Sequence, residues 1–238
     1  MNDIELLNEG LKMIEVDTTK AFEYFSKAAE LGNAEAMYYL GLVYESGDGA
    51  EMNVKKALEM FEKSRAAGFE SAASNIGNLY HYGHVDGLEP DSDRAFPYLL
   101  RAAHDDIINA MRPLSEIYLF GTDAISPNYR LAAYWALRGI EEDDTDCWYL
   151  IAVMYEHGLF FEKNLSYAKQ CYKNALPMEA ANKYLHDKMY TFVIPRKPNL
   201  ASFDDTAADF FAANRAIQWY LDEPMPNPAE VPLYFLCK

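Results

Sequence analysis

The chain has 238 residues, of which 50% are hydrophobic and 14% aromatic, so it carries enough apolar material for a core and is not expected to be disordered. Its 37 acidic residues against 21 Lys and Arg give a formal net charge of -16, which argues against a nucleic-acid groove, because phosphate binding needs a basic stripe. A basic protein partner would complement this charge, although acidity also serves solubility alone.

The cysteines and the N-terminus indicate the compartment. Cys147, Cys171 and Cys237 are odd in number and form no C-x-x-C motif, so neither a disulfide framework nor a zinc knuckle is indicated. The first residues lack the basic and apolar regions of a signal peptide, and no segment approaches the roughly 20 apolar residues of a membrane span. We therefore expect a cytoplasmic protein with reduced thiols and no membrane association.

A helical repeat is the main pattern along the chain. Residues 3–15 are expected to pair with a helix at 19–31 as a degenerate first unit. After them a Tyr-x-x-Gly motif recurs every 36 to 38 residues, and an alanine column keeps the same period. The motif stands at Tyr44/Gly47, Tyr80/Gly83, Tyr118/Gly121 and Tyr155/Gly158.

Each tyrosine is preceded by a small residue at the third position, which is Gly41, Gly77, Ser115 or Ala152. This offset places the two on one helix face, where a small residue lets the next helix approach closely. The glycine after each tyrosine predicts the end of that helix in a left-handed turn. A polar loop and a second helix follow, so each unit is predicted to be a helix, a turn and a helix.

The segments Gly41–Gly49, Val54–Phe61 and Ala66–Gly68 resemble the Sel-1-like repeat, a relative of the tetratricopeptide repeat, and Lys20–Gly32 resembles its second half. The resemblance covers roughly residues 3 to 190. It implies an all-α fold, a right-handed α-solenoid of about five helix pairs over residues 1–190, whose function is to bind another protein.

Residues 191–238 are expected to form a separate end of the solenoid. Ile194–Pro198 breaks the repeat, and Asp204 and Asp205 are expected to cap a helix that runs to Leu221. Solenoids need a terminal cap, and this helix is the candidate. The Pro-rich tail that follows is either docked along the cap or a short linear motif.

The sequence contains no motif that predicts a catalytic residue, a metal site or a cofactor. His81 and His84 could share a metal, but no third ligand is evident. The acidic run at 141–146 is either a solvated loop or an anchor for basic residues of a partner. No nucleophile motif or phosphate-binding loop appears, so the chain is expected not to be an enzyme.

The resemblance also implies where a partner would lie. In tetratricopeptide arrays the first helices line a concave groove, and four positions around the repeat tyrosine meet the ligand. These positions hold five acidic residues and one arginine, a composition that would bind a basic, partly apolar segment of a partner, unless some of the positions only contact the neighbouring repeat. The implied groove residues are Glu35, Tyr38, Leu42, Glu45, Ser74, Asn78, His81, Arg112, Glu116, Leu119, Asp146, Tyr149, Val153 and Glu156.

Three functions follow from this pattern. The leading hypothesis is a non-enzymatic adaptor or scaffold that holds a partner protein in the acidic groove. The alternative is an immunity protein or inhibitor that neutralises a bacterial toxin, since small acidic proteins associate rapidly with basic nucleases. A hydrolase is disfavoured because no nucleophile and base pair is visible.

Overall fold

The computed structural model describes residues 1–175, which divide into two compact units, Met1–Asp144 and the part of the chain from Thr145 onward. The described residues form ten α-helices and one short 3-10 helix, and their only β-bridge joins His84 to Leu88. The helices are α1 (Asp3–Met13), α2 (Thr18–Glu30), α3 (Ala34–Ser46), α4 (Val54–Ala66), α5 (Ala72–Tyr82), α6 (Ser92–His104), η1 (Ile108–Ala110), α7 (Met111–Phe120), α8 (Tyr129–Glu141), α9 (Cys147–His157) and α10 (Leu165–Asn174).

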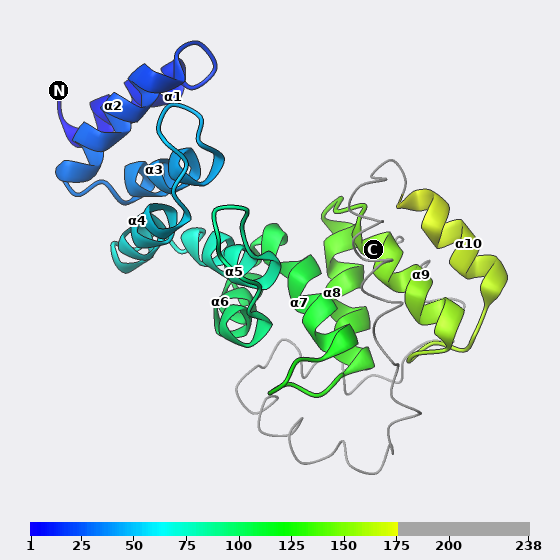
Figure 1. The fold of residues 1–238 in the computed structure, drawn as a ribbon. Helices are drawn as coiled ribbons and strands as arrows, with labels where there is room; N and C mark the ends of the chain where they lie inside the picture. Colours follow the sequence, from blue (N-terminus) through cyan, green and yellow to red (C-terminus); the bar gives the residue numbers. More distant parts are fainter. Residues whose placement is uncertain (176–238) are drawn as a thin grey trace. The chain divides into compact units, whose positions relative to one another are not determined.

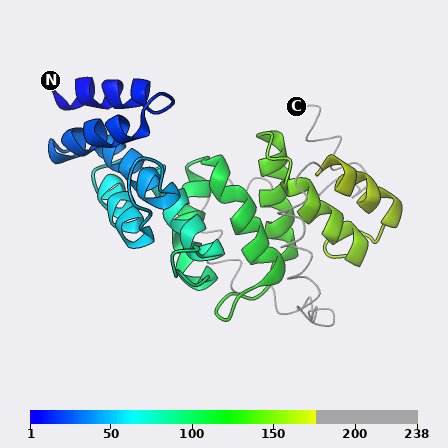
Figure 2. The ribbon, with the colours of Figure 1, turned by 45° about the horizontal axis from the view of Figure 1, so that its top comes forward.

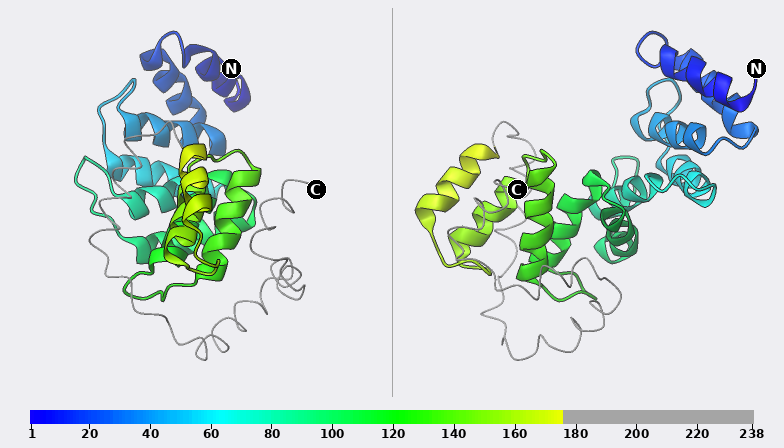
Figure 3. Two further views of the ribbon diagram at one scale, coloured as in Figure 1. Left: turned by 90° about the vertical axis from the view of Figure 1, so that its right-hand side faces the viewer. Right: turned by 180° about the vertical axis from the view of Figure 1, so that it is seen from behind.

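The first unit is a row of helix pairs in which each helix packs on the next one along the chain, from α1 to α8 (Figures 1 and 2). In the second unit, α9 and α10 form a further pair (Figure 3). Packing between sequence neighbours is the hallmark of a solenoid, so the predicted all-α solenoid is confirmed. None of the helices within residues 1–175 has both the length and the apolar character needed to cross a membrane.

The second helix of each pair begins at an asparagine or aspartate whose side chain accepts a hydrogen bond from the backbone N–H three residues on. In four of the five pairs the backbone N–H of this cap also donates to the carbonyl of the repeat tyrosine. The distances are 2.7 Å for Asn53 to Tyr44, 2.6 Å for Asp91 to Tyr80, 2.6 Å for Asn128 to Tyr118 and 2.9 Å for Asn164 to Tyr155. The five caps are Asp17, Asn53, Asp91, Asn128 and Asn164.

The glycine after each repeat tyrosine ends the first helix with a positive φ, but in two different ways. Gly47 and Gly158 adopt the predicted left-handed conformation. Gly83 and Gly121 combine a φ of 72° with an extended ψ, because the loops after them fold back against the helix end. A Cβ on Gly83 would lie 2.6 Å from the Leu88 carbonyl oxygen, so only glycine fits there.

The small residues of the first helices lie where the paired helices cross, as predicted. A Cβ on Gly41 would lie 2.5 Å from the Phe61 ring, and one on Gly77 would lie 2.6 Å from Leu99. In the next pair Ser115 replaces glycine, and its hydroxyl donates to the Ala132 carbonyl at 2.7 Å. The small side chain is therefore used for close helix approach in each of these pairs.

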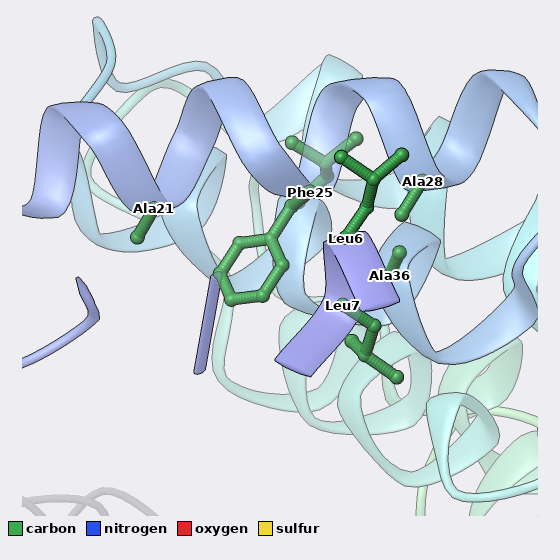
Figure 4. Close-up of a cluster of buried hydrophobic side chains, with 7 residues drawn as sticks. Leu6, Leu7, Ala21, Phe25, Ala28 and Ala36 are labelled. Atoms are coloured by element: carbon green, nitrogen blue, oxygen red, sulfur yellow. The ribbon is translucent and has the colours of Figure 1, made fainter. Parts of the chain in front are cut away.

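The predicted first repeat is confirmed as the pair α1 and α2. The core around this pair also includes two residues of α3, and it consists of Leu6, Leu7, Ala21, Phe25, Ala28, Ala36 and Leu40 (Figure 4). Phe25 packs on Gly10, which takes the place of the repeat glycine although Met13 replaces the tyrosine. The predicted fifth first helix at 181–190, the capping helix from Asp204 and the tail lie outside the described residues.

Candidate protein-binding surface

The helices α3, α5 and α7 carry the groove positions that were predicted for the first unit, but they expose them unequally. Ser74, His81, Glu116 and Leu119 are buried. Glu35, Tyr38, Leu42, Glu45, Asn78 and Arg112 are half-buried. In the second unit, Asp146, Tyr149 and Val153 are buried, whereas Glu156 is half-buried and accepts a hydrogen bond from the Tyr172 hydroxyl at 2.5 Å.

A cleft of about 460 Å³ opens beside α3 in the first unit. Leu42 and Glu45, both predicted groove residues, belong to its wall, and the other contributors come from the end of α1, the start of α2, α3 itself, the loop after α3, and α5. These other residues belong to no single repeat column, so the repeat pattern does not predict them. The lining residues are Ile14, Thr18, Ala21, Tyr39, Leu42, Val43, Glu45, Ser46, Asp48 and Asn75.

Glu45 is the unusual charge in this cleft. Burial raises the pKa of its carboxyl, and His84 and the Asn75 amide only partly oppose that shift. Its Oε2 atom is shielded from solvent and has no hydrogen-bond partner. The donor to this desolvated carboxylate is the neutral Asn75 amide, so an incoming charged donor would further stabilise its charged form.

The loop after α5 supports the helix turn that carries Glu45. His84 Nε2 lies 3.1 Å from the Glu45 carbonyl oxygen, and the backbone N–H of Asp86 donates to His84 Nδ1 at 3.2 Å. Nδ1 is therefore the acceptor, and the Nε2–H donates to Glu45. The Asp86 carboxylate accepts the backbone N–H of Val54 at 2.9 Å, which ties the same loop to α4.

His81 and Glu116 lie in a buried polar network that joins α5, α6 and α7. His81 Nε2 is 3.0 Å from Glu116 Oε2, and its Nδ1 is 2.9 Å from the Ser92 hydroxyl. The Tyr82 hydroxyl donates to Glu116 Oε1 at 3.2 Å, and burial raises the pKa of this tyrosine well above its ordinary value. Arg112 Nε lies 3.9 Å from the same oxygen. These contacts give His81 and Glu116 internal partners, so they are poorly placed to meet a ligand.

Tyr38 and Asn78 also contact neighbouring helices. The Tyr38 ring lies 5.7 Å from the ring of Phe61 and 5.0 Å from that of Phe69, measured between centroids. Asn78 donates its amide to the Asn109 carbonyl at 3.2 Å, while its Oδ1 is shielded and has no partner. The accessible chemistry of the predicted groove in this unit is therefore concentrated on α3, at Glu35, Leu42 and Glu45.

The two histidines considered for a metal have separate partners. His81 bonds to Ser92 and Glu116, whereas His84 bonds to the backbone of α3 and of its own loop. Within residues 1–175, no group of three or more His, Cys, Asp or Glu side chains is arranged to hold a metal ion. In the acidic run, residues 141–143 are exposed, while Asp146 is buried.

The chain is similar to curated proteins that are much longer. It is 29% identical over 162 residues to DAP3-binding cell death enhancer 1 of Mus musculus. The matched region covers 68% of this chain and 31% of that protein. It is 28% identical over 159 residues to the chitin synthase regulator SKT5 of Saccharomyces cerevisiae. Here the matched region covers 64% of this chain and 23% of that protein. The chain thus spans less than a third of the length of these two relatives.

A solved structure shares the fold. The crystal structure of c5321, a protective antigen present in uropathogenic Escherichia coli strains displaying an SLR fold, matches with a TM-score of 0.65 and 25% identity over 80% of this chain and 42% of that one. The Sel1 repeat model matches residues 5–33, 34–69, 70–106, 108–144 and 149–176, which follow the helix pairs described above. Together with the helix-pair geometry, these matches place the chain in the Sel1 repeat family.

Proposed function

We propose that this chain is a non-enzymatic adaptor that holds a basic, partly apolar segment of a partner protein against the acidic face of its first helices. The observation that carries the proposal is the cleft beside α3, where apolar side chains adjoin a desolvated carboxylate. Sel1 repeat proteins mediate protein–protein interaction. Two longer relatives are named for binding another protein and for regulating an enzyme, which fits the same role.

The physical basis is a surface held in place by its own hydrogen bonds. The His81 network joins successive helix pairs, and the loop at His84 and Asp86 ties α5 to α3 and α4. A partner that binds to such a preorganised surface does not have to order it first, which lowers the entropic cost of association. The chain's charge of -16 would also attract a basic partner over a distance.

The test compares two charge reversals that alter the net charge equally. One variant carries Glu35→Lys and Glu45→Lys on the proposed face, and the other carries Glu51→Lys and Glu89→Lys, which are exposed loop positions. Proteins captured from a native lysate by the unmodified chain are identified, and binding of the recovered partner to each variant is measured by titration. We expect the face variant to lose the partner and the loop variant to keep it.

Equal binding by both variants would overturn the proposed face, and a lysate that yields no specific partner would overturn the adaptor role. Raising the salt concentration should release the partner, because exposed charges are screened within about 10 Å at 0.1 M ionic strength. A partner that is a toxin, and whose activity falls on binding, would make the chain an inhibitor, the alternative left open by the sequence.

A further inference from the structure

The cleft beside α3 has an apolar part and an acceptor-rich part. Ala21, Tyr39, Leu42 and Val43 contribute apolar surface, and Ile14 borders it from the end of α1. Glu45, Ser46, Asp48 and Asn75 contribute oxygen acceptors. At about 460 Å³ the cleft falls within the roughly 300–1,000 Å³ range of small-ligand pockets, so it would take one or two side chains and not a whole helix.

The cleft carries two acidic side chains, Glu45 and Asp48, and its lining residues include no Lys, Arg or His. Glu45 Oε2 has no hydrogen-bond partner, and burial penalises its charge. Two lysines of the adjoining helices have other partners: Lys20 pairs with Asp17 at 2.9 Å, and Lys56 lies over the Tyr44 ring at 5.2 Å. A complementary ligand must therefore bring its own positive charge, on a stem that tolerates an apolar wall.

We infer that this cleft is a pocket for a single lysine side chain of the bound segment, with the methylene stem against Leu42 and Val43 and the ammonium group at Glu45 and Asp48. This inference rests on the proposed function and names the residue that the partner must supply. The stem buries apolar surface, and the ammonium group gives Glu45 Oε1 and the Asp48 carboxylate a charged hydrogen-bond donor.

The geometry favours lysine over arginine. An arginine binds a carboxylate best through two parallel hydrogen bonds, one to each oxygen. Glu45 Oε2 is shielded from solvent, so this carboxylate has only Oε1 left to offer. A lysine ammonium is a compact charge with three donors that can be shared among separate acceptors, such as Glu45, Asp48 and the Ser46 hydroxyl.

The test uses small probes in place of the unknown partner. Normal-butylammonium reproduces the lysine side chain, n-butylguanidinium carries an arginine-like head, and n-butanol is a neutral control of similar length. Each is titrated into the full chain while NMR follows the methyl groups of Leu42 and Val43 and the ring of Tyr39. We expect n-butylammonium to shift these signals at the lowest concentration, n-butylguanidinium to need several times more, and n-butanol to need the most.

Glu45→Gln should weaken n-butylammonium binding about tenfold, as expected for the loss of one charged hydrogen bond, without changing n-butanol binding. Glu51→Gln, at an exposed loop position, is the matched control and should leave the titrations unchanged. A second variant, Asp48→Asn, should weaken n-butylammonium binding to a smaller extent, and far-UV circular dichroism checks that each variant is folded.

Equal shifts with all three probes, or the same n-butylammonium affinity in Glu45→Gln as in the unmodified chain, would overturn the lysine pocket. These outcomes are separable from failure of the proposed function. If a partner is captured while n-butylammonium does not bind, the adaptor stands and the pocket falls. If n-butylammonium binds but no partner is captured, the pocket stands and the adaptor role falls.

Discussion

The ring of Phe61 on α4 occupies the space that a methyl group on Gly41 of α3 would need, since a Cβ there would lie 2.5 Å from its Cε1 atom. Gly41→Ala should therefore destabilise the protein by about 1–3 kcal/mol, the usual cost of overpacking a core. Helix propensity alone predicts the opposite sign, a gain of about 1 kcal/mol. The free energy of unfolding in urea decides between the two.

The control for this prediction is the double variant Gly41→Ala with Phe61→Leu. The smaller leucine leaves room for the added methyl group, so the double variant should lose less stability than the two single losses together. Additive losses, or a Gly41→Ala variant that is more stable than the original, would contradict a close contact at this position.

The stability of Glu45→Gln should depend on pH in a defined direction. Burial raises the pKa of Glu45 in the folded chain, so folding favours the protonated carboxyl. The stability that this carboxyl contributes is present below its unfolded pKa, about 4.3, and is lost as the pH rises through the folded value. Glutamine avoids that loss, so the variant should melt at a higher temperature than the original chain at pH 7, and the difference should vanish toward pH 4. A gain in melting temperature that is the same at both pH values would contradict the assignment.

Removal of the Glu116 carboxylate should be among the most damaging single changes in the first unit. Glu116→Ala leaves His81 and Tyr82 without their shared acceptor, and breaking a buried pair in this way costs about 3–5 kcal/mol. Glu116→Gln retains an acceptor oxygen and should cost less. Urea unfolding measures both variants, and a loss within about 0.5 kcal/mol for Glu116→Ala, as at a typical surface site, would show that the network is not a structural joint.

The buried thiols should be unreactive while the protein is folded. Burial raises the pKa of Cys171 to about 12, which leaves little thiolate at pH 8, and Cys147 is fully buried. In a Cys237→Ser background, we expect no fast reaction with a thiol-specific disulfide reagent at pH 8 and reaction of both cysteines in urea. Rapid labelling of the folded chain would show that α9 or α10 opens readily.

The helix pairs could be predicted from the sequence because the tyrosine, glycine and alanine columns reflect local packing that recurs in each unit. Gly10 escaped notice because the tyrosine that marks its column is replaced by Met13. The site was harder to predict, since Glu45, His81 and Leu119 share one column position but differ in chemistry and surroundings. His81 meets a carboxylate 35 residues away, and such a contact between repeats depends on how neighbouring pairs pack. The predicted groove also includes residues of the second unit, and their role in binding a partner stays a prediction.

In four of the five pairs, the hydrogen bond from the second-helix cap to the tyrosine carbonyl makes the connecting loop useful for engineering. It closes the connection at the same two atoms although the segments between glycine and cap differ in length, so the helix pairs accommodate loops of different length. Foreign peptides, such as epitopes or protease sites, could be inserted beside the exposed Glu89, where His84 and Asp86 keep their bonds to α3 and α4. A repeat unit of this kind is suited to presenting an inserted peptide on a folded scaffold.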